Sequence, residues 1–137
     1  MLAEEREHKK KLPGVKLSED MVITGNLEAA VHEKDVLVLA VPSPFTRATA
    51  KKMAPYIVEG QIIVDVAKGI EEDTLLTLSE QIRQEIPQAD VAVLSGPSHA
   101  EEVGRGIPTT CVISGPKRET AEYLQGIFMS LYFVCIQ

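Results

Sequence analysis

Short apolar runs that alternate with amphipathic segments restrict the fold of this chain more than any other feature. The runs are rich in Val and Ile and carry almost no polar alternation, which is typical of strands covered on both faces of a sheet. Strands and helices alternating in this way predict an α/β fold with a parallel sheet and right-handed crossovers. The predicted strands are Met21–Thr24, Val36–Val41, Ile62–Val66, Val91–Leu94, Thr110–Ile113 and Tyr132–Ile136. The predicted helices are Leu27–Lys34, Pro44–Tyr56, Thr74–Glu85, His99–Arg105 and Pro116–Met129.

Small, polar and cationic residues follow three of the predicted strands, at the edge where doubly wound sheets hold their ligands. The three segments are Val41-Pro42-Ser43, Val66-Ala67-Lys68-Gly69 and Ser95-Gly96-Pro97-Ser98-His99-Ala100-Glu101-Glu102. Because the carboxyl ends of parallel strands meet at one edge, we expect these segments to form one rim of one site.

Residues that cap helices stand before several of the predicted helices. The single candidates are Asn26, Ser43 (followed by a first-turn proline) and Asp73. Ser98, with Glu101 three residues later, has the spacing of a capping box, in which each side chain satisfies a backbone N–H at the helix start. These positions predict helices that begin soon after the strands end.

The composition is that of one ordinary domain. A chain of 137 residues with 45% apolar and 25% charged residues can bury a core. The net charge of −6 disfavours a nucleic-acid surface, and no apolar stretch reaches the ~20 residues of a membrane span. Because the N-terminus has no hydrophobic signal segment, we expect a cytoplasmic protein.

Cysteine spacing and local charge restrict the chemistry further. Cys111 and Cys135 lie in apolar runs, spaced for neither a metal site nor a redox pair, so we expect buried thiols in a reducing compartment and no metal. The basic stretch Met1–Lys16 has two interpretations, a solvated helix end or a contact with a phosphorylated ligand.

A glycine-rich phosphate loop is missing from this pattern. Nucleotide-binding doubly wound domains open with a strand, a G-x-G-x-x-G turn and a helix, and this sequence contains no such motif. The chain opens instead with the charged segment Leu2–Lys11, which reads as the tail of a helix. We therefore expect residues 1–137 to be a partial dinucleotide-binding domain with a mostly parallel, Rossmann-like sheet that lacks its first strands and its Gly-rich loop.

Several blocks, in this order and spacing, resemble the NAD(P)-dependent glycerol-3-phosphate dehydrogenases over essentially the whole chain. The blocks are Lys11–Leu17, Leu27–Ala30, Leu39–Ser43, Ala67–Glu71, Leu94–Val103 and Gly106–Thr109. The resemblance implies that NAD or NADP exchanges a hydride with dihydroxyacetone phosphate, giving sn-glycerol 3-phosphate for glycerophospholipids. It also implies a C-terminal helical substrate domain, absent here, that carries the general acid/base lysine beyond Gln137.

The resemblance assigns roles to residues of the rim. Lys68 matches a lysine close to both cofactor and substrate, where a cation would stabilise the carbonyl oxygen as it gains charge. Gly96 and Ser98 match substrate contacts, and Ala100 matches a cofactor contact. The competing interpretations are a solvated lysine for Lys68 and a simple helix cap for Ser98.

Aromatic positions of the family agree with this sequence only in part. Phe45 corresponds to an aromatic residue that packs near the cofactor, although it could equally be a core residue. His99 stands where the family often has Phe, and we interpret it as a packing or capping-region side chain. Lys11 replaces a residue that is usually aromatic and near the cofactor.

Missing first strands would leave the strand at Val36–Val41 as an exposed apolar edge, and such edges pair with other chains. We therefore expect a homo-oligomer formed through this edge, or a rearranged Met1–Thr24 segment that covers it.

Three functions remain open at this stage. The first is the glycerol-3-phosphate dehydrogenase reaction, for which the isolated chain is expected to be inactive. The second is another dehydrogenase of similar architecture, ketopantoate reductase-like or hydroxyacid dehydrogenase-like. The third is a non-catalytic interaction module that uses the exposed edge to bind a partner.

Overall fold

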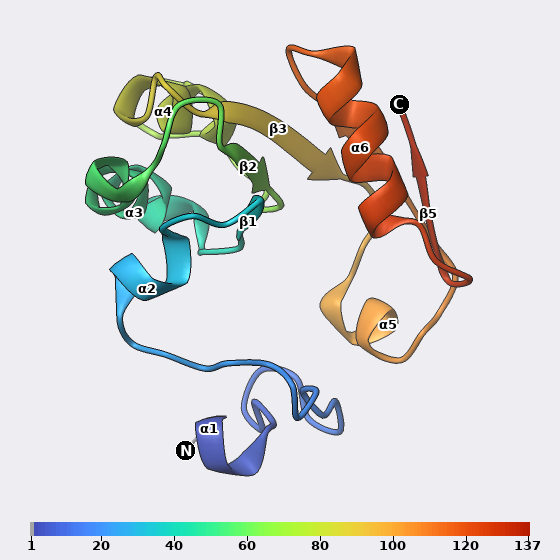
Figure 1. The fold of residues 1–137 in the computed structure, drawn as a ribbon. Coiled ribbons are helices and arrows are strands. Elements are labelled where there is room, and N and C mark those ends of the chain that lie inside the picture. The colour runs from blue at the N-terminus through green and yellow to red at the C-terminus, as the bar shows by residue number, and fades with distance from the viewer. Residues whose placement is uncertain (1) are drawn as a thin grey trace.

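The computed structural model describes residues 2–137, with five strands in one sheet whose spatial order follows the chain (Figure 1). The strands are β1 (Val36–Leu39), β2 (Ile62–Asp65), β3 (Asp90–Ser95), β4 (Thr109–Ser114) and β5 (Phe133–Ile136). The helices are α1 (Leu2–Glu5), α2 (Leu27–Val31), α3 (Thr46–Met53), α4 (Leu78–Glu85), α5 (Ala100–Gly104) and α6 (Arg118–Phe128). Short 3₁₀ turns span Ser43–Phe45 and Ala54–Tyr56.

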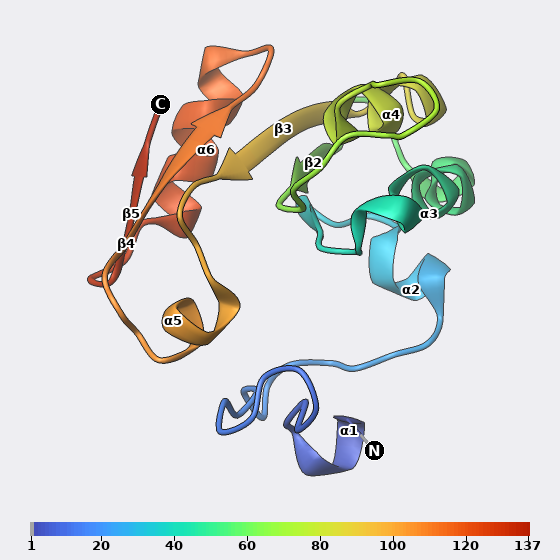
Figure 2. The same cartoon turned by 180° about the vertical axis from the view of Figure 1, so that it is seen from behind.

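Helices cover both faces of the sheet, which confirms the doubly wound α/β prediction. On one face, α2, α3 and α4 pack over β1, β2 and β3, with Ile63, Ile82 and Val91 fully buried between them. On the other face, α6 packs on β3, β4 and β5 around Val64 and Leu124. Figure 2 shows α2, α3 and α4 at one end of the sheet and α6 at the other end.

The direction of the strands changes once, between β3 and β4. β1, β2 and β3 are parallel, and β4 and β5 are parallel, but β4 runs antiparallel to β3, with Leu94 opposite Ile113. The mostly parallel sheet expected from the sequence is therefore confirmed, and the pairing of β3 with β4 is the antiparallel exception among the described strands. A parallel connection needs a helix that packs across a sheet face. The intervening α5 is five residues long and buries none of them, so the chain turns back at the edge.

The predicted strand Met21–Thr24 does not form. These residues are extended, and Val22 is 86% exposed. A strand needs a hydrogen-bonded neighbour, and none of residues 2–137 pairs with this stretch. Instead the Arg6 guanidinium donates hydrogen bonds to the carbonyls of Ser18, Glu19 and Met21, which closes residues 6–21 into a loop.

The N-terminal segment leaves the edge of the sheet uncovered. Among the described residues, β1 is hydrogen-bonded to β2 alone, and Val38 is 51% exposed. Part of this segment lies instead beside α5 (Figure 1), where a Cβ placed on Gly104 would lie 2.8 Å from the Val15 Cγ2. The alternative in which Met1–Thr24 covers this strand is therefore wrong for residues 2–24, while Met1 lies outside the described residues.

Helix starts agree with the sequence only in part. The Asn26 side chain accepts a hydrogen bond from the Ala29 N–H at 3.1 Å, which confirms the predicted cap of α2. Asp73 does not start α4, because Thr77 and Glu80 form the capping box and the preceding residues make a separate turn. Ser43 makes no capping hydrogen bond and is itself the first residue of a 3₁₀ turn.

Candidate functional site

The carboxyl ends of β1, β2 and β3 lie at the same edge of the sheet. Leu39, Asp65 and Val93 are in register across the three strands. The chain leaves this edge through three segments: residues 40–45 after β1, residues 66–77 after β2 (the Lys68 loop) and residues 96–99 after β3 (the Ser98 loop). The three segments of the expected rim therefore start side by side.

Lys68 and Ser98 meet across this rim. The Lys68 Nζ donates a hydrogen bond to the Ser98 Oγ at 3.2 Å, although the two residues come from different loops. The Ser98 hydroxyl also donates to the Gly96 carbonyl at 3.4 Å, within its own loop. This arrangement places a cation beside a hydroxyl at the strand edge, a pairing that can hold an oxygen atom which carries negative charge.

The predicted capping box at Ser98 and Glu101 is wrong. The helix α5 begins at Ala100, its N-cap is His99, and no side chain caps it. Because the Ser98 hydroxyl is engaged with Lys68 and Gly96, it is not used at the helix start. The competing interpretation of Ser98 as a simple cap is therefore also wrong.

Gly96 has a structural requirement that sequence reasoning did not anticipate. A Cβ at this position would lie 2.6 Å from the Thr110 carbonyl oxygen and 2.9 Å from the Cys111 Cα, both in the backbone of β4. The sequence suggested that glycine admits the backbone close to a ligand. In the structure the neighbour that demands glycine is the antiparallel strand β4.

Two hollows flank Lys68. One of about 300 Å³ lies toward β1 and is lined by residues 40–43 and 66–68. The other, of about 280 Å³, lies toward β3 and the start of α4, and Asp65, Ser79 and Ser95 contribute to its wall. Both hollows are open to solvent at the strand edge, so Lys68 lies between two places where a ligand can approach.

Asp65 is a residue of this site that sequence reasoning missed. It is the last residue of β2, it is 2% exposed, and burial raises the pKa of its carboxyl. Its Oδ1 accepts a hydrogen bond from the Ala67 N–H at 3.1 Å, which shapes the chain just before Lys68. An acid within the apolar run Ile62–Val66 was the signal that could have found it.

The remaining candidates lie at the periphery of the rim. Phe45 is 60% exposed at the end of its 3₁₀ turn, so the interpretation as a core residue is wrong. Ala100 is exposed at the first position of α5. Neither residue lines the two hollows beside Lys68.

An ion-pair cluster joins the Lys68 loop to α3 and α4. Arg47 donates from Nε and Nη2 to the two oxygens of Glu71, at 2.6 and 2.7 Å, and from Nη1 to Glu85 at 2.8 Å. Thr74 also donates its hydroxyl hydrogen to Glu71. The hydrogen bonds from Arg47 and Thr74 lower the pKa of Glu71 to about 2. The sequence showed none of this, because these residues are far apart along the chain.

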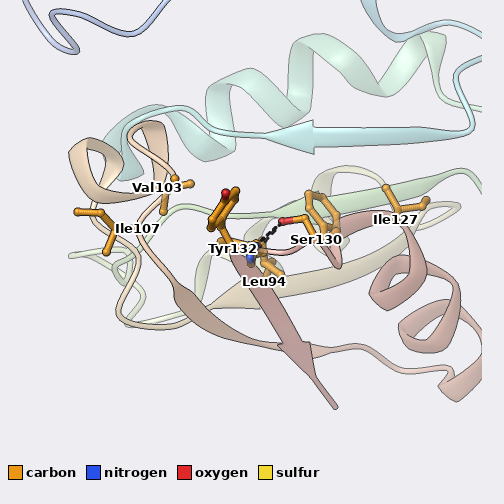
Figure 3. A pocket seen from close by; sticks show the side chains of 9 residues that line it. Leu94, Val103, Ile107, Ile127, Ser130 and Tyr132 are labelled. Atoms are coloured by element: carbon orange, nitrogen blue, oxygen red, sulfur yellow. Dashed lines mark hydrogen bonds between the residues drawn. The ribbon is translucent and has the colours of Figure 1, made fainter.

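Another hollow, of about 410 Å³, contains none of the predicted site residues. Figure 3 shows side chains that line it, among them Leu94, Val103, Ile107 and Ile127. The Ser130 hydroxyl in this wall accepts hydrogen bonds from the backbone N–H groups of the turn that leads into β5. With no charged side chain in its lining, this hollow does not suit a phosphorylated ligand.

The rim fits one end of a dinucleotide better than the other. Lys68 and Ser98 present a cation and a hydroxyl, which suit the reacting end and a carbonyl substrate. A pyrophosphate needs a row of free N–H groups at a glycine-rich turn, whereas the segment after β1 contains Pro42 and Pro44, which have no N–H. Within residues 2–137, no three His, Cys, Asp or Glu side chains are grouped to hold a metal ion.

Both cysteines of the chain lie in strands of the sheet. Cys111 and Cys135 are both free and buried. They lie opposite each other on β4 and β5.

No helix in the described part of the chain is long and apolar enough to cross a membrane.

Comparisons with known proteins place this geometry in context. Residues 1–121 match the family model for the N-terminus of NAD-dependent glycerol-3-phosphate dehydrogenase. The chain is 58% identical to the glycerol-3-phosphate dehydrogenase [NAD(P)+] of Agathobacter rectalis, over 97% of this chain and 40% of that protein. It is 55% identical to the protein of the same name from Fusobacterium nucleatum, over 93% of this chain and 39% of that protein.

A solved structure has the same fold. The glycerol-3-phosphate dehydrogenase of Coxiella burnetii matches with a TM-score of 0.90 and 24% identity, over 98% of this chain and 41% of that one. The chain thus spans about 40% of the length of the curated relatives it matches.

Proposed function

The chain belongs to the NAD-dependent glycerol-3-phosphate dehydrogenase family, and on that premise we propose that it forms part of an enzyme that interconverts dihydroxyacetone phosphate and sn-glycerol 3-phosphate with NAD(P)H. The observation that carries the proposal is the hydrogen bond between Lys68 and Ser98 at the carboxyl edge of the sheet. The product would supply glycerophospholipid synthesis. Two buried free thiols are compatible with a reducing compartment, and we extend the proposal to the cytoplasm.

Lys68 would act on the carbonyl of the substrate. When that carbonyl is reduced its oxygen gains negative charge, and a cation already in place stabilises this charge without reorganisation. Gly96 and Ser98 would orient the substrate from the other side, through a backbone group and a hydroxyl. The nicotinamide would supply the hydride, while these residues would bind and orient the reactants.

Phe45, Lys68 and Ala100 are the proposed contacts to the cofactor. Phe45 and Ala100 are both exposed beside the rim, which leaves their side chains accessible to a bound ligand. Since the sequence has no Gly-rich phosphate loop, we propose that residues 1–137 act as a partial dinucleotide-binding domain and do not turn over substrate alone. The general acid/base lysine would come from a C-terminal helical domain.

A fluorescence titration with NADH and NADPH tests this function. We expect saturable binding to the 137-residue chain and a dissociation constant at least about tenfold higher for Lys68→Ala, which corresponds to about 1.4 kcal/mol. Lys52→Ala, which removes an exposed lysine on α3, is the matched control. Absence of binding at millimolar cofactor, or equal weakening by both variants, would contradict the proposed role of Lys68.

Adding substrates to the same titration separates the enzyme classes. Dihydroxyacetone phosphate should change the NADH fluorescence of the wild-type chain, whereas a 2-keto acid of similar size should not. A response to the keto acid alone would favour the hydroxyacid or ketopantoate type of dehydrogenase.

We also propose that the chain forms a homo-oligomer through the free edge of β1. The open backbone groups of this strand and the half-exposed Val38 support the proposal. Light scattering should show a mass that rises with concentration and returns to that of a monomer in Val38→Lys. A strict monomer at high concentration would contradict it. Capture of a different protein by this edge would favour the interaction module.

A further inference from the structure

The Lys68 loop has little regular structure of its own. Its twelve residues, 66–77, contain no helix, and Ile70 and Thr77 form an isolated bridge. Two of its residues have positive φ angles, Gly69 at 142° and Leu75 at 58°. At Leu75, which is not a glycine, such a conformation persists only where its surroundings hold it. The structure therefore needs a support that keeps Lys68 directed toward Ser98.

The 3₁₀ turn Ser43–Phe45 and the first turn of α3 lie against this loop at two points shortly after Lys68. The first is Gly69, where a Cβ would lie 3.0 Å from the Ser43 Cβ. The second is Glu71, whose two carboxylate oxygens accept hydrogen bonds from Nε and Nη2 of Arg47. Ser43 and Arg47 are four residues apart, so one continuous stretch of chain, the 3₁₀ turn with the first turn of α3, supports the loop at both places.

Arg47 itself is fixed from a third direction. Its Nη1 donates to Glu85 in the last turn of α4, at 2.8 Å. The three side chains are only 30%, 21% and 23% exposed for Arg47, Glu71 and Glu85, so this cluster is shielded more than an ordinary surface ion pair. Arg47 thereby joins α3, the Lys68 loop and the end of α4.

We propose that Arg47 is a positioning residue for Lys68, which acts by holding Glu71 in a two-point hydrogen bond and so fixing where the Lys68 ammonium group lies. The importance of Lys68 rests on the proposed function, but the positioning by Arg47 does not. The planar guanidinium is required because a lysine would keep the charge and lose the two parallel hydrogen bonds.

Nuclear magnetic resonance of the labelled 137-residue chain, without cofactor, tests this proposal. Two readouts are needed. One is hydrogen exchange of the Glu71 and Leu75 amides, which donate to the carbonyls of Leu76 and Glu71 within the loop. The other is the Lys68 ¹⁵Nζ signal, which reports the hydrogen bond to Ser98 and would not respond to a general loss of stability.

In Arg47→Lys we expect exchange of the two amides to become about tenfold faster and the Lys68 Nζ signal to move to the position of a free lysine. The control is Arg118→Lys, which alters an exposed pair with Glu122 on α6 and should leave both readouts unchanged. An unchanged Lys68 signal in a folded Arg47→Lys chain would overturn the proposal, even if the loop amides exchange faster.

Glu71→Gln is the second variant, in case Arg47→Lys does not fold. It keeps the shape of the side chain and weakens the same contact, so the same movement of the Lys68 signal is expected. If the signal stays in place there too, the proposal is wrong. These readouts use no cofactor, so a chain that fails to bind NADH would contradict the proposed role of Lys68 toward the cofactor and would leave the positioning by Arg47 to stand.

Discussion

The Lys68 loop and the Ser98 loop meet at one hydrogen bond, yet they are held in place in different ways. The Lys68 loop is long, and a cluster of charges, Arg47 with Glu71 and Glu85, ties it to two helices. The Ser98 loop is short, and Gly96 is pressed against the backbone of β4. One half of the site therefore depends on ionisation, and the other depends on the absence of a side chain.

Because of this difference, the two loops should respond to different perturbations. Charged contacts near the surface respond to pH and salt, whereas close backbone packing responds to added volume. Each of the following four perturbations should affect one loop more than the other.

Gly96→Ala should have the largest effect. The new Cβ would collide with backbone atoms of Thr110 and Cys111 in β4. Because the backbone of a paired strand cannot move without breaking its hydrogen bonds, we expect a loss of about 3 kcal/mol in the free energy of unfolding. Urea denaturation measures it. Gly126→Ala in α6 is the control, since that Cβ meets nothing within 4 Å and should stabilise the helix by about 0.5 kcal/mol. Unfolding like that of the wild type would show that β4 does not confine the Ser98 loop.

Gly69→Ala should have a smaller effect in the Lys68 loop. Alanine disfavours a φ of 142° and would press on the Ser43 side chain, which can rotate, so we expect a loss of about 1 to 2 kcal/mol. Thermal or urea unfolding measures this loss. Gly60→Ala shares the positive φ but adds its Cβ in open space, so the difference between the two variants isolates the contact with Ser43. A loss as large as that of Gly96→Ala would remove the contrast between the loops.

Acid should loosen the Lys68 loop selectively. The folded pKa of Glu71, about 2, lies below the ordinary value of 4.5, so its ionised form stabilises the native state above pH 4.5, and this contribution is lost as the pH falls toward 2. The difference in urea midpoint between the wild type and Glu71→Gln should shrink across this window. A difference that stays constant down to pH 2 would show that Glu71 is not held by Arg47.

Salt should have the smallest effect. Raising NaCl from about 0.1 to 1 M shortens the screening length to about 3 Å, and we expect roughly twofold faster exchange of the Glu71 and Leu75 amides. The Ser98 amide, which donates to the Gly96 carbonyl, should exchange at an unchanged rate. Equal responses at both loops would contradict a difference in how they are held.

Sequence patterning predicted the strands and the rim because both follow from local signals. Apolar runs located all five strands that form, and the residues behind three of them brought Lys68 and Ser98 to one edge. The stretch at Met21–Thr24 has the same apolar pattern but no partner strand among the described residues. The composition of one segment does not indicate whether a second strand is present to pair with it.

The contacts that hold the site together could not be predicted from local sequence patterns. Arg47 and Glu71 are separated by 24 positions, and neither stands out in the sequence. The antiparallel turn at β4 depends on the failure of α5 to pack on the sheet, which its amphipathic pattern did not reveal. The same turn then explains why Gly96 tolerates no Cβ, although the sequence linked that glycine to a ligand.

The spatial order of the strands, which repeats their order along the chain, bears on how the molecule is made. Each strand joins a neighbour that was synthesised just before it, so no early strand must wait for a late one to find its partner. The sheet can therefore grow strand by strand as the chain leaves the ribosome, and the Ser98 loop reaches its final position only when β4 packs against Gly96.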